Sequence, residues 1–239
     1  MKKLFITLLI PFCGYAAVAQ TTHKTIVKKS TKTVAATSKP TSLLDSASYA
    51  FGLSMATSLK GSGLKTLNYE LMVKGLKDAF SGQTPLMTQE ASQKAIESLF
   101  KNVSQSKFSA NITEGANFLA NNKKNPGVKT TASGLQYQVI TPGNGAKPAV
   151  TDTVLVNYKG TLLNGKQFDS SYDRNEPLSL SLDRVIPGWT EGMQLMSPGA
   201  KYKFFIPYNL AYGERGAGQD IPPYSTLIFE IELLKVNGK

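Results

Sequence analysis

Apolar side chains recur at three- or four-residue steps from Leu44 to Leu119, which is the spacing of amphipathic helices. The first helix is expected to end at Gly61-Ser62-Gly63, because closely spaced glycines stop helices. Asn68 and Thr88 can each cap the start of a further helix with a side-chain oxygen. The pattern therefore predicts three helices, the last of which runs without a break from Thr88 to Leu119.

The third predicted helix carries an apolar stripe that two short helices cannot cover. The members of the stripe are Ala95, Ile96, Leu99, Phe100, Val103, Phe108, Ile112 and Leu119. Such a stripe must pack on the rest of the chain or on a second copy of it. Dimerisation is the favoured alternative, so residues 43–124 are interpreted as an all-α helical dimerisation region.

The pattern changes after Asn125-Pro126-Gly127, which stops the last helix. Short runs of alternating or continuous apolar residues follow, at 134–140, 153–158, 160–163, 178–182, 201–206 and 226–236, and they indicate β-strands. Asn164-Gly165 is a strong hairpin signal, and Trp189 to Met196 is the only helical stretch here. Residues 129–239 are therefore predicted to form an α+β domain with one short helix on a sheet face, joined through a linker at 125–128. Phe204 and Leu233 are expected in its core.

The N-terminus has the features of a secretory signal peptide. Lys2 and Lys3 precede the apolar stretch Leu4 to Phe12, which is too short to span a bilayer comfortably. Ala17-Val18-Ala19 is a suitable cleavage site, so residues 1–19 are predicted to be removed on export to the periplasm or cell envelope of a bacterium. An uncleaved membrane anchor is the alternative. Cleavage would remove Cys13, the only cysteine, and exclude disulfides and thiol chemistry from the mature chain.

The net charge of +11 is concentrated at the N-terminus, where residues 1–42 hold seven lysines and no acid. Residues 20–42 are rich in Lys, Thr and Ser and are interpreted as a disordered basic tail, which could also contact anionic lipid or an envelope polymer. Residues 129–239 are close to neutral, whereas a nucleic-acid-binding domain concentrates positive charge on its fold. No nucleic-acid partner is therefore expected.

The usual catalytic side chains are missing from the body of the chain. The only histidine, His23, lies in the tail, which excludes Ser-His-Asp and Cys-His mechanisms and a histidine-held zinc. No Gly-Lys-Ser/Thr follows the glycines at 213–218, so a phosphate loop is not expected. Carboxylate pairs such as Glu230 and Glu232 suggest a glycosidase only weakly. We expect neither a cofactor nor a metal.

Aromatic and apolar residues around Trp189, the single tryptophan, indicate a pocket for an apolar ligand with a few placed polar groups. One reaction needs no nucleophile, metal or cofactor, namely rotation about an X–Pro peptide bond. Its barrier of roughly 18–20 kcal/mol comes from amide resonance. A dry pocket can favour the twisted amide, while a fixed hydroxyl or backbone N–H holds the neighbouring carbonyl.

Five blocks of sequence in this region resemble, in order and with compatible spacing, the FKBP-type peptidyl-prolyl cis-trans isomerases. The blocks are Val156–Leu162 (VNYKGTL), Gly165–Ser171 (GKQFDSS), Val185–Gly192 (VIPGWTEG), Ala211–Gly213 (AYG) and Ile221–Phe229 (IPP…LIF). The resemblance implies an antiparallel five-to-six-stranded sheet wrapped on one short helix. Ser48–Gly52 and Gly75–Phe80 extend it to the periplasmic FkpA and macrophage-infectivity-potentiator branch, in which the N-terminal helices form a V-shaped dimer with chaperone activity.

The resemblance also assigns roles residue by residue. Trp189 would form the pocket floor under the proline ring, and Ile221 would lie in an overhanging loop. The Ile186 N–H and the Tyr212 hydroxyl would hold substrate carbonyls, and Asp169 would organise the polar side through Tyr158 and Arg174. The walls would be Tyr158, Phe168, Val185, Ile186 and Phe229. The implied partners are unfolded or proline-containing exported polypeptides, and rapamycin-type macrolides are candidate ligands.

Three positions depart from the family pattern. Leu178 replaces a common aromatic wall residue, Ala217 replaces a common histidine, and Arg184 replaces an acid found in some members. These departures bear on macrolide affinity and sequence preference more than on the basic activity. Two other functions remain in competition, namely a dimeric holdase with little isomerase activity and an envelope-anchoring protein that uses the basic tail.

Overall fold

The structure, a computed structural model, describes residues 39–238. The predicted signal peptide, with Cys13, and residues 20–38 of the predicted tail, with His23, lie outside the described residues. In the part that is described, no helix is both long enough and apolar enough to cross a membrane.

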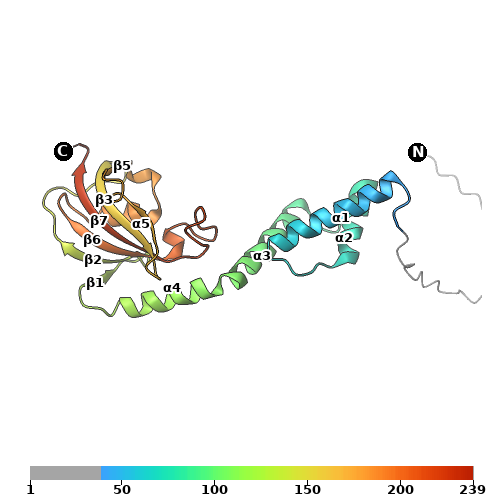
Figure 1. Ribbon diagram of the computed structural model, residues 1–239, viewed down its shortest axis with the longest axis horizontal. Helices are drawn as coiled ribbons and strands as arrows, with labels where there is room; N and C mark the ends of the chain where they lie inside the picture. The colour runs from blue at the N-terminus through green and yellow to red at the C-terminus, as the bar shows by residue number, and fades with distance from the viewer. Residues whose placement is uncertain (1–38, 239) are drawn as a thin grey trace, which may run out of the picture. The chain divides into compact units, whose positions relative to one another are not determined.

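The first half of the described chain is helical, as predicted. Its helices are α1 (Leu43–Gly61), α2 (Tyr69–Ser81), α3 (Gln89–Lys107) and α4 (Ser109–Asn122) (Figure 1). Both predicted caps are confirmed: Asn68 Oδ1 accepts from the Leu71 N–H, and Thr88 Oγ1 accepts from the Ala91 N–H, each at 3.1 Å. Gly82 ends α2 in the left-handed conformation, with φ of 66°.

The prediction of one unbroken helix from Thr88 to Leu119 is wrong. Phe108 leaves the helical region, with φ of −107° and ψ of 23°, and it separates α3 from α4. Its N–H donates to the Ser104 carbonyl, while its own carbonyl accepts from the Ile112 N–H. Because one helix ends and the next begins at this single residue, the apolar spacing continues across the break and conceals it.

The second half contains an antiparallel sheet, in agreement with the predicted α+β class. Its strands are β1 (Val128–Thr130), β2 (Gln136–Thr141), β3 (Thr153–Leu162), β4 (Gln167–Ser170), β5 (Leu178–Ser181), β6 (Lys201–Ile206) and β7 (Leu227–Val236). The order across the sheet is β1-β2-β6-β7-β3-β4, and β5 also pairs with β3. The sequence did not predict β1 and β4, which are only three and four residues long.

The predicted hairpin at Asn164-Gly165 is confirmed and joins β3 to β4. The Leu162 N–H donates to the Lys166 carbonyl at 2.9 Å, and Gly165 has φ of 83°. The two segments predicted on either side of Lys159 form a single strand, β3, whose register shifts after Gly160. This hairpin brings Asp169 and Phe168 on β4 beside β3.

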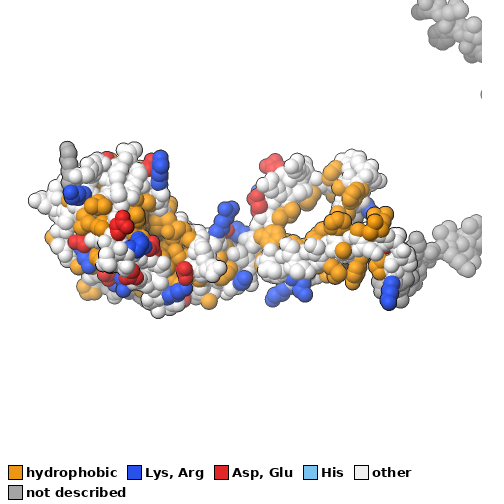
Figure 2. Space-filling view, turned by 45° about the horizontal axis from the view of Figure 1, so that its top comes forward, with side chains coloured by type: hydrophobic (Ala, Val, Ile, Leu, Met, Phe, Trp, Pro, Cys, Tyr) orange, Lys and Arg blue, Asp and Glu red, His pale blue; other side chains and the backbone are white. Residues whose placement is uncertain are grey.

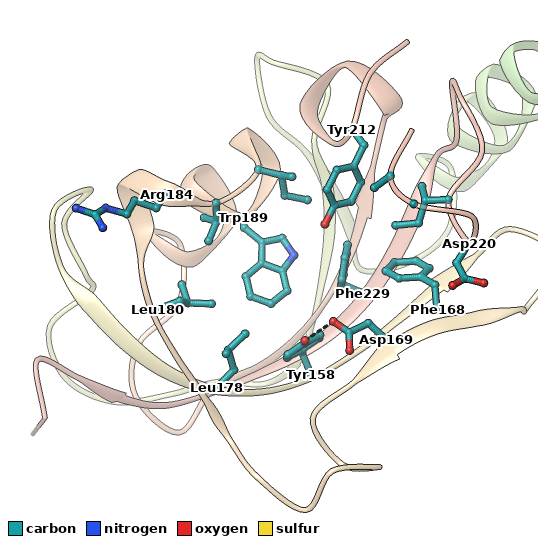
Figure 3. Close-up of a pocket in the computed structure, with 15 residues that line it drawn as sticks. Tyr158, Phe168, Asp169, Leu178, Leu180, Arg184, Trp189, Tyr212, Asp220 and Phe229 are labelled. Atoms are coloured by element: carbon teal, nitrogen blue, oxygen red, sulfur yellow. Dashed lines mark hydrogen bonds between the residues drawn. The ribbon is translucent and has the colours of Figure 1, made fainter. Parts of the chain in front are cut away.

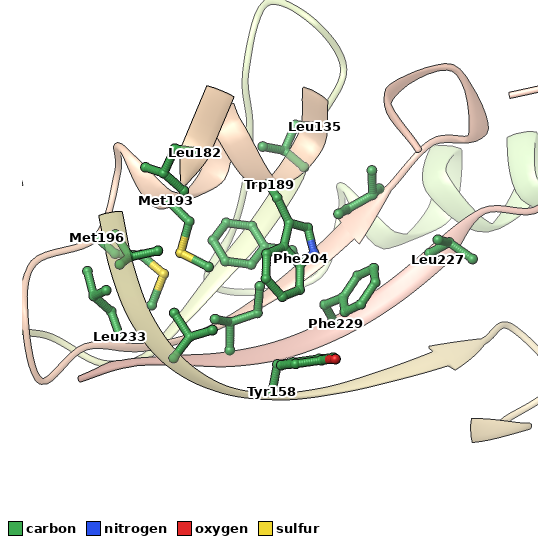
Figure 4. Close-up of a cluster of buried hydrophobic side chains, with 14 of the residues drawn as sticks. Leu135, Tyr158, Leu182, Trp189, Met193, Met196, Phe204, Leu227, Phe229 and Leu233 are labelled. Carbon is green, nitrogen blue, oxygen red and sulfur yellow. The ribbon is translucent and has the colours of Figure 1, made fainter. Parts of the chain in front are cut away.

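Helix α5 (Pro187–Met193) packs against one face of the sheet and completes the core (Figure 4). Glycines allow the close approach: a Cβ on Gly192 would lie 2.7 Å from the Phe204 ring, and one on Gly188 would lie 2.5 Å from Ile206. Phe204 and Leu233 are buried, as expected. The other large residues of the core include Leu135, Val154, Val156, Leu182, Met193, Met196, Leu227 and Ile231.

Helix α4 is tied to the sheet by polar contacts. The buried side chain of Asn122 donates to Gln136 Oε1 at 2.9 Å, and Gln136 Nε2 donates to the Leu119 carbonyl at 2.8 Å. Asn111 Nδ2 donates to the Pro223 carbonyl, also at 2.9 Å. These bonds connect the helix before the predicted linker to β2 and to the segment between β6 and β7. The exact domain boundaries stay a prediction.

Candidate functional site

A cavity of about 520 Å³ opens beside α5 (Figure 3), within the range typical of small-ligand sites. The residues around it come from β3, β4, β5, the stretch that leads into α5, α5 itself, the segment between β6 and β7, and β7. They are Tyr158, Phe168, Asp169, Leu178, Leu180, Arg184, Val185, Ile186, Trp189, Tyr212, Ala217, Gly218, Asp220, Ile221 and Phe229.

The floor and one wall of the cavity are built from aromatic rings that meet edge to face. The ring centre of Trp189 lies 5.1 Å from that of Tyr158 and 5.2 Å from that of Phe229, at interplanar angles of 81° and 85°. Phe168 meets Phe229 in the same way, at 5.5 Å and 82°. Edge-to-face contacts of this kind are favourable beyond the burial of area, so the apolar lining is held in a defined shape.

One side of the cavity is polar, and a three-residue network orders it. The Tyr158 hydroxyl donates to Asp169 Oδ2. Arg174 Nη1 donates to Asp169 Oδ1 at 2.5 Å, and its Nη2 donates to the Tyr158 hydroxyl at 2.9 Å. Because two donors from different strands and loops converge on it, the Asp169 carboxylate has a fixed orientation at the pocket edge.

The network shifts the pKa of its members. Partial burial acts to raise the pKa of Asp169, but hydrogen bonds from Tyr158 and Arg174 and the charge of the guanidinium outweigh it, so the pKa lies below its ordinary value. Burial, followed by the bond to Asp169, raises the pKa of the Tyr158 hydroxyl. At neutral pH, Asp169 is therefore charged while Tyr158 stays protonated as the donor.

Two further polar groups can face a ligand. The Tyr212 hydroxyl points into the cavity from the side opposite Asp169 (Figure 3). Burial, and then the charge of Asp169, raise its pKa, so it remains a donor at neutral pH. The carbonyl of Ile186 accepts from the backbone N–H groups of Trp189 and Thr190 at the start of α5. Within residues 39–238, the Ile186 N–H itself donates to no other backbone group.

The segment 212–221 covers part of the cavity. Ala217 and Ile221 exchange backbone hydrogen bonds of 2.9 and 3.1 Å, and the Tyr224 N–H closes the base of the segment onto the Gly213 carbonyl at 3.0 Å. Ile221 is buried and lines the cavity. Helix α4 supports the same base through the bond from Asn111 to Pro223.

The structure brings the sequence-predicted residues together. All nine of the residues predicted to be catalytic or substrate-binding line the one cavity: Tyr158, Phe168, Asp169, Val185, Ile186, Trp189, Tyr212, Ile221 and Phe229. Arg174 does not line it but hydrogen-bonds to Asp169 and Tyr158, which do. The chemical roles assigned to these residues stay predictions.

Sequence reasoning missed three residues of the lining, namely Leu180, Gly218 and Asp220. Leu180 could have been found, because it lies two residues from Leu178 on a strand and therefore on the same face. Asp220 carried no local signal, since the fold of its segment alone turns it toward the cavity.

Comparisons with known proteins agree on one family. A family model described as FKBP-type peptidyl-prolyl cis-trans isomerase matches residues 144–234. A second, described as the domain amino terminal to FKBP-type peptidyl-prolyl isomerase, matches residues 44–139.

Individual relatives extend over most of the chain. The FKBP-type 22 kDa peptidyl-prolyl cis-trans isomerase of Escherichia coli is 45% identical over 80% of this chain and 94% of its own length. The outer membrane protein MIP of Legionella longbeachae is 40% identical over 80% of this chain and 85% of its own. The crystal structure of FkpA from Escherichia coli superposes with a TM-score of 0.54 and 43% identity, over 83% of this chain and 98% of that one.

Proposed function

This chain belongs to the FKBP-type peptidyl-prolyl cis-trans isomerases, and we propose that it accelerates X–Pro bond rotation in the pocket floored by Trp189. The observation that carries the proposal is the set of aromatic rings around Trp189, faced from two sides by the Tyr212 hydroxyl and the Asp169 network. The substrates are proline-containing exported polypeptides.

The pocket acts through environment and positioning. Planarity of the X–Pro amide depends on charge separation between its oxygen and nitrogen, and a barrier of roughly 18–20 kcal/mol resists twisting. Trp189 and Phe229 surround the proline ring with apolar surface, which favours the twisted amide because that form has less charge separation. The Tyr212 hydroxyl and the Ile186 N–H hold the substrate carbonyls while the bond turns. Asp169, fixed by Tyr158 and Arg174, sets the polar side of the pocket.

The deciding experiment is the cis-to-trans rate of a Leu-Pro test peptide with mature protein. Asp169→Ala and Tyr212→Phe should each lower kcat/KM by roughly ten- to hundredfold. The upper end of this range equals the smallest effect seen when one oxyanion-hole donor is removed. Tyr202→Phe is the matched control, because the Tyr202 hydroxyl makes only a 3.4 Å contact with the Leu195 carbonyl, outside the pocket. Unchanged rates in both pocket variants would refute the roles given to these residues.

A second function, as a homodimeric chaperone, is favoured by the apolar surface of the helical region. Hydrophobic side chains gather there (Figure 2), and a surface of this extent is typical of an interaction site. The exposed large residues on α1, α2 and α3 include Tyr49, Phe51, Leu53, Leu71, Val73, Leu76, Phe80, Ile96 and Leu99. We propose that residues 43–124 form the dimer and that the paired helices hold unfolded chains. If folded wild-type protein failed to accelerate the test peptide, this holdase function would be the principal one.

The location and a small-molecule ligand are also part of the proposal. The predicted signal peptide at 1–19 supports export to the periplasm or cell envelope, and cell fractionation of strains with and without residues 20–42 separates a free protein from one held by its basic tail. The dimensions and apolar lining of the pocket suit rapamycin-type macrolides, whose binding would be measured as competitive inhibition of the test reaction.

A further inference from the structure

Three charged side chains line the pocket, namely Asp169, Asp220 and Arg184. The two carboxylates are already paired: an Asp169 oxygen lies 2.5 Å from Arg174 Nη1, and an Asp220 oxygen lies 2.8 Å from Lys166 Nζ. Within residues 39–238, no carboxylate oxygen lies within 4.0 Å of the Arg184 guanidinium nitrogens, and Arg184 belongs to none of the ion pairs.

Carboxylates near Arg184 in the fold make other contacts. Asp183, the preceding residue, accepts from the Ser181 hydroxyl at 2.6 Å. Glu191, on the same side of α5 as Val185 and Pro187, accepts from the Ser133 hydroxyl at 2.6 Å. Each carboxylate accepts a hydroxyl hydrogen bond and neither lies within 4.0 Å of the Arg184 guanidinium nitrogens, which leaves the guanidinium available to solvent or to a ligand.

Arg184 lies at one end of the pocket. Figure 3 shows it near Leu180, with Trp189 in the centre of the pocket and Asp220 and Phe168 at the far end. The guanidinium points outward from the cavity and the residue is exposed. Trp189, under the proposed position of the proline ring, lies between Arg184 and Asp220, so a substrate side chain directed toward the Leu180 end would meet the guanidinium.

We infer that Arg184 is a specificity-determining residue that selects substrates with an acidic side chain on one side of the proline. The inference rests on the proposed isomerase function. A guanidinium presents a planar fork of donors that matches a carboxylate in two parallel hydrogen bonds. Since the pair would form at an exposed rim, its effect is that of a surface ion pair, about two- to fivefold in kcat/KM, and it weakens as salt screens it.

The test is a ratio of rates measured within each protein variant. Two peptide series vary the residue before or after proline as Glu, Gln or Lys. In the wild-type protein, Glu should exceed Gln by about two- to fivefold at one of the two positions. The Glu-to-Gln ratio of kcat/KM should approach one in Arg184→Gln and fall below one in Arg184→Glu. In the wild-type protein it should shrink toward one in about 0.5 M NaCl.

The control separates a local contact from the overall field of the protein. Lys129→Gln removes the same charge from an exposed position on β1, at the opposite edge of the sheet from β3 and β5, and its Glu-to-Gln ratio should equal that of the wild type. The inference would be overturned if Arg184→Gln kept the wild-type Glu-to-Gln ratio. It would also be overturned if Arg184→Gln and Lys129→Gln lowered that ratio equally. Either result would leave the isomerase activity itself established. A wild-type protein inactive on every peptide, the Gln series included, would instead remove the isomerase function on which the inference depends.

Discussion

Gly160 leaves an empty space that the ring of Phe168 fills. A Cβ on Gly160 would lie 2.6 Å from two carbons of the Phe168 ring and 2.7 Å from the Phe229 ring. Gly160 pairs with Asp169 on one side and Phe229 on the other, so it is the point of β3 at which the polar and aromatic walls of the pocket meet. The absence of a side chain there lets Phe168 reach its edge-to-face position on Phe229.

Gly160→Ala should therefore damage the pocket as well as the stability of the fold. The added methyl group has to displace a ring in a packed wall, at a cost of about 1–3 kcal/mol in the free energy of unfolding. We expect kcat/KM to fall as Phe168 moves, measured beside urea unfolding. Gly52→Ala is the matched control, since its Cβ would meet no atom within 4 Å in α1 and alanine favours helices. Wild-type activity in Gly160→Ala would show that Phe168 is not needed in its present position.

The pH dependence of activity should follow Asp169 on the acid side. Its folded-state pKa lies below the ordinary value of 3.8, so the network contributes stability above that value and loses it as the pH falls through the folded pKa. Burial and the charge of Asp169 raise the pKa of Tyr212 above its ordinary value of 10.0, so its hydroxyl does not titrate near neutral pH. We therefore expect kcat/KM to stay level from about pH 5 to 9 and to fall only at a pH below 3.8, where the folded protein binds a proton at Asp169.

Asp169→Asn is the comparison for this profile, because the amide cannot titrate. Its activity should be low at every pH, and the acid limb should be missing. An acid limb of the same shape in Asp169→Asn would assign the titration to another group.

Phe80→Asp should weaken the proposed dimer without unfolding the chain. The Phe80 side chain on α2 is 91% exposed in the single chain, so a charge there costs the monomer little but opposes burial against a second copy. Sedimentation should give a dimer for the wild type and a larger monomer fraction for the variant. Ile140→Asp, on the exposed part of β2, should stay dimeric. A monomeric wild-type protein at all concentrations would contradict the dimer.

Asn111→Ala should loosen the segment that covers the pocket. The Asn111 side chain donates to the Pro223 carbonyl at 2.9 Å, and its loss leaves that carbonyl unpaired at a cost of about 1 kcal/mol. We expect KM to rise more than kcat falls, and hydrogen exchange to increase at 213–224. Asn117→Ala, exposed on the same helix, should change neither. Unchanged exchange in Asn111→Ala would show that α4 does not hold the segment.

Much of this protein could be read from local sequence. The caps at Asn68 and Thr88, the turn at Gly165 and the alternating strands depend on residues a few positions apart, so spacing alone identified them. The break at Phe108 and the strand β1 could not be identified in this way. Helical spacing continues across a single non-helical residue, and a three-residue strand is defined by its partner β2 rather than by its own pattern.

In the candidate site, too, some features follow from the local sequence and others depend on contacts between distant residues. The amino-acid order alone identified the aromatic and polar residues of the pocket, because that order matched a known family. The tertiary structure was needed to show that Asp220 pairs with Lys166, that Arg184 pairs with no carboxylate of residues 39–238, and that Asn111 on α4 contacts Pro223, 112 residues away. Charge pairing and long-range contacts depend on distances in space, which strand register and the packing of α4 and α5 determine and which local spacing along the chain does not contain.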